Sequence, residues 1–363
     1  MVLTVSWILA VISMFFVVPN PAYIEYIDWR SLGILWSLMV ITKGLSVNGF
    51  FEKIGHTLLS KTKYVWQLVV VLVMLCFLTS MLITNDVALI TFVPFTIMML
   101  SLCDRKDLMI MVIVLQTIAA NLGSMLTPIG NPQNLYLYGL SGMSIQEFIL
   151  LMLPFTLVSL VLLLISILFI KGKTKPIVSM GDIKKKSGSR IKAYLYGMLF
   201  FLALSVVARF LPYYVLVFAV LIAVILIDAG VILKVDYCLL LTFVGFFIFT
   251  GNIGKIEAVN SVLKDLVAGR EVVVGVLASQ FISNVPAALL LSDFTQNIKG
   301  LIVGVNIGGL GTMIASMASL ISYKLYANVE DAAKGRYFVI FTLMNVIYLT
   351  VLLLFTFVIP FFR

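Results

Sequence analysis

The sequence has little charge, a single histidine and only three cysteines, and each shortage excludes a class of protein. Of its 363 residues, 11% are charged, whereas soluble domains carry about 25%. With 62% hydrophobic residues and a mean hydropathy of +1.15, the chain has more apolar surface than a soluble core could absorb. His56 and the scattered Cys76, Cys103 and Cys238 have no metal-ligand or disulfide spacing. The composition therefore predicts an integral membrane protein with no zinc site, no disulfide framework and no cofactor.

The net charge of +9 comes largely from one stretch of the chain. Eight of the 25 basic residues lie between positions 171 and 192. A basic loop between apolar helices is typical of the cytoplasmic side of a membrane protein. The charge is therefore a topology signal, and it predicts contact with lipid headgroups and no nucleic-acid partner.

Apolar runs of about 17 to 25 residues predict membrane crossings, and the sequence contains about nine. The first run lacks a basic n-region and is followed by Pro19-Asn20-Pro21, so it is expected to be a retained helix and not a signal peptide. Two segments, 48–60 and 253–268, are predicted to be amphipathic helices on opposite faces of the membrane. The predicted spans are 3–18, 29–42, 108–135, 148–170, 191–209, 213–228, 237–250, 300–325 and 337–360.

Two further apolar regions, 64–102 and 272–296, are interrupted by polar residues. The interruptions are Thr84-Asn85-Asp86 in the first region and Ser283-Asn284-Val285 in the second. Basic residues flank both ends of the first region, which fits either a re-entrant hairpin or two complete crossings. The polar tip favours the hairpin, because non-helical backbone at membrane depth is tolerated only where protein or a water-filled cavity satisfies it.

The two halves of the chain match one another at polar positions in the same order. Asp28-Trp29 recurs as Asp236-Tyr237, at an offset of 208 positions, and the two polar interruptions are 199 positions apart. A third set of matches has an offset of 185: Asn121, Gly123, Thr127, Ile129, Leu135 and Tyr138 correspond to Asn306, Gly308, Thr312, Ile314, Leu320 and Tyr323. An odd number of crossings between the halves turns the second one over, so the pattern predicts an inverted repeat.

These matches predict the organisation of the chain. The first repeat is expected at 1–170, a basic cytoplasmic linker at 171–192, a connecting helix at 193–209 and the second repeat at 210–363. Each repeat holds one hairpin (64–102 and 272–296) and one broken helix (108–135 and 300–325). Counting crossings outward from the linker places the N-terminus in the cytoplasm and the C-terminus outside. The predicted fold class is an all-α, multi-pass protein of the cell membrane with the architecture of a secondary transporter.

Polar and small residues at the hairpin tips and helix breaks are the candidate binding residues. Pro128, Gly130 and Pro132 fall inside an otherwise helical run and must break it, which exposes carbonyl groups and a half-helix N-terminus. The predicted substrate-binding and ion-binding residues are Thr84, Asn85, Asp86, Thr127, Pro128, Gly130, Asn131, Asn134, Ser283, Asn284, Val285, Thr312, Ala315 and Ser316. The candidate Na+ ligands among them are Thr84, Asp86, Gly130, Ser283 and Thr312.

Asp86 is the strongest single candidate for a functional residue. A carboxylate in hydrocarbon costs at least about 2.5 kcal/mol, so its default role is cation ligand, proton carrier or both. The alternative is a surface carboxylate on a loop at the membrane face. Asn85 and Asn284 either donate amide N–H groups to an anion or cap helices at the hairpin tips.

Three runs of residues resemble the motifs of the ion transporter superfamily, which includes divalent-anion sodium symporters, arsenite permeases and NhaD-type antiporters. These runs are Thr84-Asn85-Asp86-Val87-Ala88, Thr127-Pro128-Ile129-Gly130-Asn131-Pro132-Gln133-Asn134 and Ser283-Asn284-Val285-Pro286-Ala287. The resemblance covers nearly the whole chain. It implies hairpin tips and unwound loops that hold coupling cations and substrate, an elevator-like motion against a scaffold, and often a homodimer.

The chain departs from the carboxylate symporters of that superfamily, in which both hairpin tips read Ser-Asn-Thr. Here the third position is Asp86 in one tip and Val285 in the other. The Asn-Asp pair is more similar to the arsenite permease and antiporter branch. The run from Ile129 to Asn134 resembles that of the YbiR-like anion permeases.

The sequence therefore predicts a secondary active transporter that couples a small anionic or oxyanion substrate to Na+ or H+. A Na+/H+ antiporter without an organic substrate and an arsenite-type efflux permease remain as alternatives. A channel is disfavoured because no pore-lining charged ring repeats along the chain. An enzyme is not expected, because no catalytic constellation of histidine, cysteine or carboxylate is evident.

Overall fold

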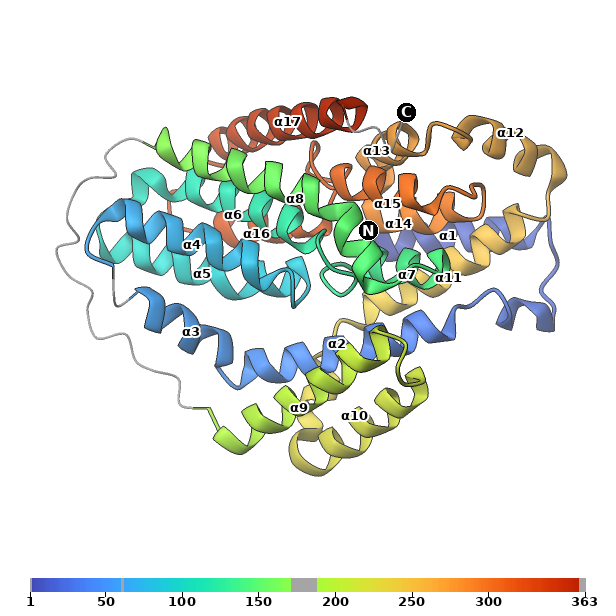
Figure 1. Cartoon of the computed structure of the whole chain (residues 1–363), viewed down its shortest axis with the longest axis horizontal. Helices are drawn as coiled ribbons and strands as arrows, with labels where there is room; N and C mark the ends of the chain where they lie inside the picture. The colour runs from blue at the N-terminus through green and yellow to red at the C-terminus, as the bar shows by residue number, and fades with distance from the viewer. Residues whose placement is uncertain (1, 60–61, 171–187, 359–363) are drawn as a thin grey trace.

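The computed structural model describes residues 2–59, 62–170 and 188–358, and its regular elements in that part of the chain are helices (Figure 1). The first half contains α1 (Val2–Met14), η1 (Pro21–Ile24), α2 (Trp29–Val47), α3 (Phe50–Leu59), α4 (Val65–Thr79), α5 (Asn85–Leu102), η2 (Lys106–Leu108), α6 (Met109–Ser124), α7 (Pro132–Ser141) and α8 (Ile145–Leu168). After α9 (Arg190–Val207), the rest contains α10 (Tyr213–Asp228), η3 (Ala229–Lys234), α11 (Tyr237–Ile253), α12 (Glu257–Val267), α13 (Glu271–Ile282), α14 (Asn284–Ser292), α15 (Ile298–Ile307), α16 (Met317–Ala327) and α17 (Lys334–Val358).

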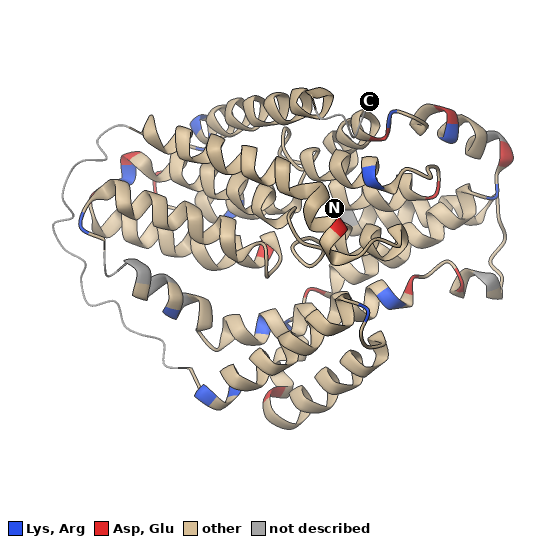
Figure 2. Cartoon of the chain, in the orientation of Figure 1, with Lys and Arg blue, Asp and Glu red and all other residues tan. Residues whose placement is uncertain are grey.

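Six helical segments of the described chain are long and apolar enough to cross a membrane. They contain α5, α6, α8, α9, α10 and α17, and several shorter apolar helices accompany them. Large apolar side chains such as Leu150, Phe201 and Leu226 are mostly exposed on these helices, and charged residues are sparse along them (Figure 2). Such surfaces are stable in lipid and not in water. The prediction of an all-helical, multi-pass membrane protein is confirmed, while the number of nine crossings stays a prediction.

The helix boundaries differ most from the predicted spans in three places. The first helix ends at Met14 and not at residue 18, since the chain turns before Pro19. Helix α2 continues to Val47 and not only to residue 42. The broken helix continues past residue 135 to Ser141, where Gly142 ends it with a left-handed φ of 69°.

The two halves use the same order of elements, with α9 between them. The series α2, α3, the α4–α5 pair, the α6–α7 pair and α8 is repeated as α11, α12, the α13–α14 pair, the α15–α16 pair and α17. In Figure 1 the two hairpins approach the centre of the molecule from opposite sides of the view. Helices α13 and α14 have 12 and 9 residues, about 18 and 14 Å at 1.5 Å per residue. Neither can cross about 30 Å of hydrocarbon alone. Residues 171–187 of the predicted basic linker lie outside the described residues.

The halves are interlocked, because each packs a helix against the other. Helix α1 packs along α11, and α10 packs along α2. The indole of Trp7 donates to the carbonyl of Leu241 at 3.1 Å, and the Asn252 amide donates to the Ser13 hydroxyl at 2.9 Å. These contacts join the first helix of one half to the second helix of the other.

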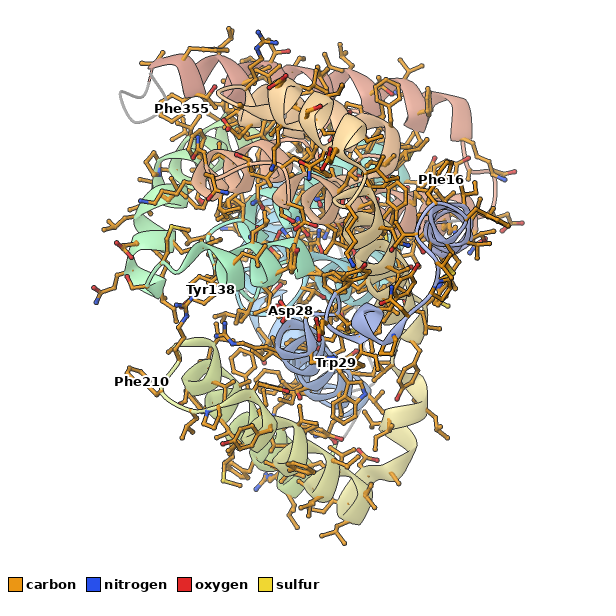
Figure 3. All side chains as sticks on the ribbon, turned by 90° about the vertical axis from the view of Figure 1, so that its right-hand side faces the viewer. Phe16, Asp28, Trp29, Tyr138, Phe210 and Phe355 are labelled. Carbon is orange, nitrogen blue, oxygen red and sulfur yellow. The ribbon has the colours of Figure 1, made fainter. Side chains whose placement is uncertain are left out.

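Helices α2, α9 and α10 pack together beside the rest of the molecule. A Cβ on Gly44 of α2 would overlap the ring of the buried Tyr196 on α9, so only glycine permits this approach. The Tyr196 hydroxyl donates to Asp228 at 3.1 Å, and Lys192 forms an ion pair with the same carboxylate at 2.8 Å. In Figure 3 helix α2, with Asp28 at its start, lies between the α9–α10 pair and the remaining helices, whereas Phe210 lies at the periphery.

Candidate functional site

The first hairpin is joined to the break in the helix that follows it. We call residues 84–86 tip 1 and residues 125–131, between α6 and α7, break 1. The backbone N–H of Asn85 donates to the carbonyl of Gly130 at 3.2 Å. The hydroxyl of Thr127 donates to the carbonyl of Met81. Tip 1 and break 1 therefore form one unit.

The second hairpin is joined to its own break by the equivalent bonds. Residues 283–285 are tip 2, and residues 308–316, between α15 and α16, are break 2. The backbone N–H of Asn284 donates to the carbonyl of Ala315 at 2.9 Å, and the Thr312 hydroxyl donates to the carbonyl of Gln280 at 3.0 Å. Each hairpin atom lies 199 positions and each break atom 185 positions after its first-half counterpart. The offsets seen in the sequence thus correspond to matching hydrogen bonds.

A close approach between hairpin and broken helix is also repeated. A Cβ on Gly123 of α6 would overlap the carbonyl oxygen of Phe77 and lie 2.6 Å from the Ser80 hydroxyl. The equivalent Gly308 would meet the hydroxyl of Ser279, the counterpart of Ser80, at 2.7 Å. Both glycines let a hairpin arm rest directly on the backbone of the broken helix.

Gly123→Ala should therefore separate the first hairpin from α6. The obstructing atom is backbone and cannot rotate away, and overpacking of this kind costs about 1–3 kcal/mol. We expect a clearly lower melting temperature in detergent and weaker ligand binding. Gly197→Ala on α9 is the matched control, since a Cβ there meets nothing within 4 Å, and it should leave the melting temperature unchanged or raise it. Equal stability of the two variants would contradict the close approach.

Two buried asparagines connect the halves across the centre. The Oδ1 of Asn121, on α6, accepts from the Asn85 amide at 2.9 Å and from the Ser316 hydroxyl at 3.0 Å. The equivalent Asn306, on α15, donates from its amide to Oδ1 of Asn134 at 2.6 Å. All five side chains are at most 5% exposed. The tips and breaks of both halves therefore belong to one buried polar network.

Four helix N-termini begin at this network without a side-chain cap. The N-cap residues of α5, α7, α14 and α16 are Thr84, Asn131, Ser283 and Ser316, and none accepts a capping hydrogen bond from its own helix. By contrast, Ser144 caps α8 at the periphery. The first backbone N–H groups of a helix have no intrahelical partner and carry the positive end of its dipole. The first N–H groups of α5 and α14 already bond the breaks, and α7 begins with a proline, so the later first-turn N–H groups and the four helix dipoles are what suits this centre to an anion.

Asp86 lies in the first turn of α5 and is half-buried. In the described part of the chain its carboxylate has no hydrogen bond and no ion pair, and its backbone N–H is bonded to the Asn85 side chain at 2.9 Å. The charged group that acts on it is a second carboxylate, that of Asp236 at the start of α11. Two carboxylates that repel one another favour a bound cation, which would offset their charge.

Several buried amide atoms beside the network lack partners among the residues that the structure describes. They are Oδ1 of Asn131, Oδ1 of Asn306 and both polar atoms of Gln133, which is 1% exposed. A buried polar group without a hydrogen bond costs about 1–3 kcal/mol. Unpartnered buried groups of this kind are where a water molecule, an ion or a ligand would complete the hydrogen bonding.

Most of the predicted site residues lie in or beside the buried network, and two of them lie outside it. Gly130, Asn131 and Asn134 lie in the network, and Pro128, Val285 and Ala315 are buried within the tips and breaks. Ser283, with a left-handed φ of 75°, has its hydroxyl 3.4 Å from the Ala315 carbonyl. The hydroxyls of Thr127 and Thr312 instead bond the hairpin arms, and Thr312 is exposed.

Sequence reasoning missed four amide side chains at the site. Asn121 and Asn306 carried a signal, since they match at the offset of 185, yet only the structure shows that they join the halves. Gln133 stands in one of the runs that carry the resemblance, but its counterpart is Ala318, so no polar pair marks it. Gln280 carried no signal, because its counterpart is Met81. In the described chain no three His, Cys, Asp or Glu residues gather as metal ligands.

Comparisons with known proteins agree with a transport role. The family described as "Citrate transporter" matches residues 1–299. An uncharacterized transporter of Methanocaldococcus jannaschii is 34% identical over 92% of this chain and 91% of its own length. The inner membrane protein YbiR of Escherichia coli is 32% identical over 88% of this chain and 86% of its own length. A silicon efflux transporter of Oryza sativa is 33% identical over 35% of this chain and 26% of its own length.

Proposed function

Because this chain belongs to the citrate transporter family and is a membrane transporter, we propose that it moves a small anion or oxyanion across the membrane, coupled to Na+ or H+. The observation that carries this proposal is the meeting of four uncapped helix N-termini at one buried network. Backbone N–H groups and helix dipoles would hold the negative charge of the substrate without a buried arginine or lysine.

The coupling cation is assigned to tip 1 and break 1. Asp86 supplies a carboxylate that has no partner among the described residues, and the unwound backbone of residues 125–131 supplies carbonyl oxygens, including that of Gly130. Unwound carbonyls and half-helix ends are the usual Na+ ligands in transporters of broken helices. A cation bound there also offsets the charge of an anion at the neighbouring N-termini, so each favours the binding of the other.

We also propose that the halves are inverted repeats and that transport is elevator-like. Support comes from the repeated element order, the hairpins that approach from opposite sides and the exchange of α1 and α10 between halves. In this proposal α2, α9 and α10 form the scaffold, and the hairpins with the broken helices form the moving domain. A homodimer through the scaffold is part of the same hypothesis.

The function is tested with purified protein in liposomes. Uptake of sulfate, phosphate, arsenite, citrate and succinate is measured with a sodium gradient, with a proton gradient and with neither. Anion uptake that requires a cation gradient is the expected result. Sodium movement driven by a proton gradient without any anion would instead support the Na+/H+ antiporter, and gradient-independent release of arsenite the efflux permease.

The proposed topology has the N-terminus in the cytoplasm and the C-terminus outside. In a variant without Cys76, Cys103 and Cys238, single cysteines at Ser187 and Ser141 should react with a membrane-impermeant maleimide from opposite sides. Only Ser187 should be reached from the cytoplasm, because α8 crosses the membrane between the two positions. Labelling of both from the same side would overturn the inverted arrangement.

A further inference from the structure

The side chain of Gln280, in the last turn of α13, forms hydrogen bonds with the backbone of break 2. Its Nε2 donates to the carbonyl oxygens of Gly308 and Leu310 at 3.0 Å each, and to that of Val276 at 3.2 Å. Its Oε1 accepts the backbone N–H of Thr312 at 2.9 Å. An amide NH2 group aimed at several carbonyl oxygens stands where a small cation would be coordinated by the same atoms.

The equivalent place in the first half has no such donor. The counterpart of Gln280 is Met81, 199 positions earlier, whose thioether cannot donate a hydrogen bond. The counterpart of Leu310 is Met125, 185 positions earlier, and within the described residues its carbonyl oxygen accepts no hydrogen bond. Among the described residues, break 1 therefore keeps the Met125 carbonyl open, whereas break 2 pairs the equivalent Leu310 carbonyl with Gln280.

The charges of the two tips also favour a cation in the first half and not in the second. Tip 1 carries Asp86, and the equivalent position of tip 2 is Val285, which is 7% exposed. The first half thus offers a carboxylate and an open carbonyl at Met125, whereas the second offers an apolar side chain and, at the equivalent Leu310, a carbonyl that is bonded to Gln280. Both differences make the second half less suited than the first to bind a cation.

We infer that the protein binds a single sodium ion per chain, at tip 1 and break 1, and that the amide of Gln280 permanently takes the position of a second ion. The inference rests on the cation coupling proposed above and gives it a stoichiometry of one ion per transport cycle. Break 2 keeps its shape with no ion bound, and Ser283 and Thr312 are not ion ligands.

The test counts sodium ions bound to the purified full-length chain with radioactive sodium in a scintillation proximity assay. Wild type should bind one ion per chain and Asp86→Asn none. The double variant Gln280→Met/Val285→Asp gives the second half the residues of the first and should bind two. Asn345→Leu is the control at a buried amide of α17, since among the residues that the structure describes the Asn345 side chain bonds only a carbonyl of its own helix, and it should keep one ion.

Any other number of bound sodium ions would contradict a specific part of the inference. Two ions on wild type, one of them retained by Asp86→Asn, would overturn the single site while the proposed transport function stands. A folded double variant that binds one ion would overturn the role given to Gln280. If that variant does not fold, wild type and Asp86→Asn still decide the number of sites. Failure of wild type to bind sodium would overturn the sodium coupling itself, and the inference with it.

Discussion

Asp86→Asn should lose cation-coupled transport by about a hundredfold or more while the protein is produced at normal yield. The amide keeps the shape of the carboxylate and removes its charge, and a loss of about 3 kcal/mol in ion binding corresponds to about a hundredfold. The carboxylate has no protein partner to leave behind in the described chain, so little folding energy depends on it. Asp86→Glu should retain some activity with altered ion affinity, because the added methylene shifts the charge.

The measurement is uptake by reconstituted protein against sodium concentration at several pH values. In wild type, protons and sodium should compete, so that more sodium is needed for half-maximal uptake as pH falls; the asparagine variant should show no such shift. Asp265→Asn, at an exposed carboxylate of α12, is the matched control and should behave as wild type. If Asp86→Asn kept the wild-type sodium and pH dependence, coupling would have to reside in backbone carbonyls and hydroxyls.

Asn121→Leu is expected to have the second-largest effect, on both stability and binding. Its Oδ1 accepts from Asn85 and from Ser316, so the substitution leaves two buried donors unpaired. Each orphaned donor costs about 1–3 kcal/mol in soluble proteins, and about 0.6 kcal/mol is the average for hydrogen bonds between membrane helices. We expect a loss of about 2 kcal/mol in the free energy of unfolding and at least a tenfold loss of substrate or ion affinity.

Thermal unfolding in detergent and sodium binding measure the two effects of Asn121→Leu. The control is again Asn345→Leu, which removes a fully buried amide whose donor, within the described part of the chain, bonds only the carbonyl of Phe341 four residues earlier. It should be close to neutral, because it also removes an unpaired oxygen. Equal behaviour of the two variants would mean that the bonds across the halves carry no energy specific to the site.

Much of the fold was predictable because its elements are marked by local chemistry. Proline and glycine break the helices at Pro128 and Gly130, and long apolar runs fix the spanning segments. The matches at offsets of 199 and 185 predicted equivalent positions, and the bonds of Asn85 and Asn284 to their breaks follow those offsets.

The remaining features depend on packing between distant segments. Nothing in the sequence says that α1 packs on α11 while α10 packs on α2, because apolar faces are alike in composition. The role of Gln280 was equally hidden, since a lone amide in an apolar run has no counterpart in Met81. A sequence repeat shows which positions the two halves share. The differences between the halves in packing and hydrogen bonding are seen only in the structure.

The exchange of α1 and α10 between the halves has a consequence for biosynthesis. When the ribosome has completed the first half, α2 still lacks the helix that covers it, and α1 has no α11 to pack against. The first half therefore remains only partly packed in the membrane until the residues beyond position 237 have been synthesised. Neither half should be stable when produced alone, yet the two expressed as separate chains should rescue one another, with the break in the chain placed in the basic segment between α8 and α9.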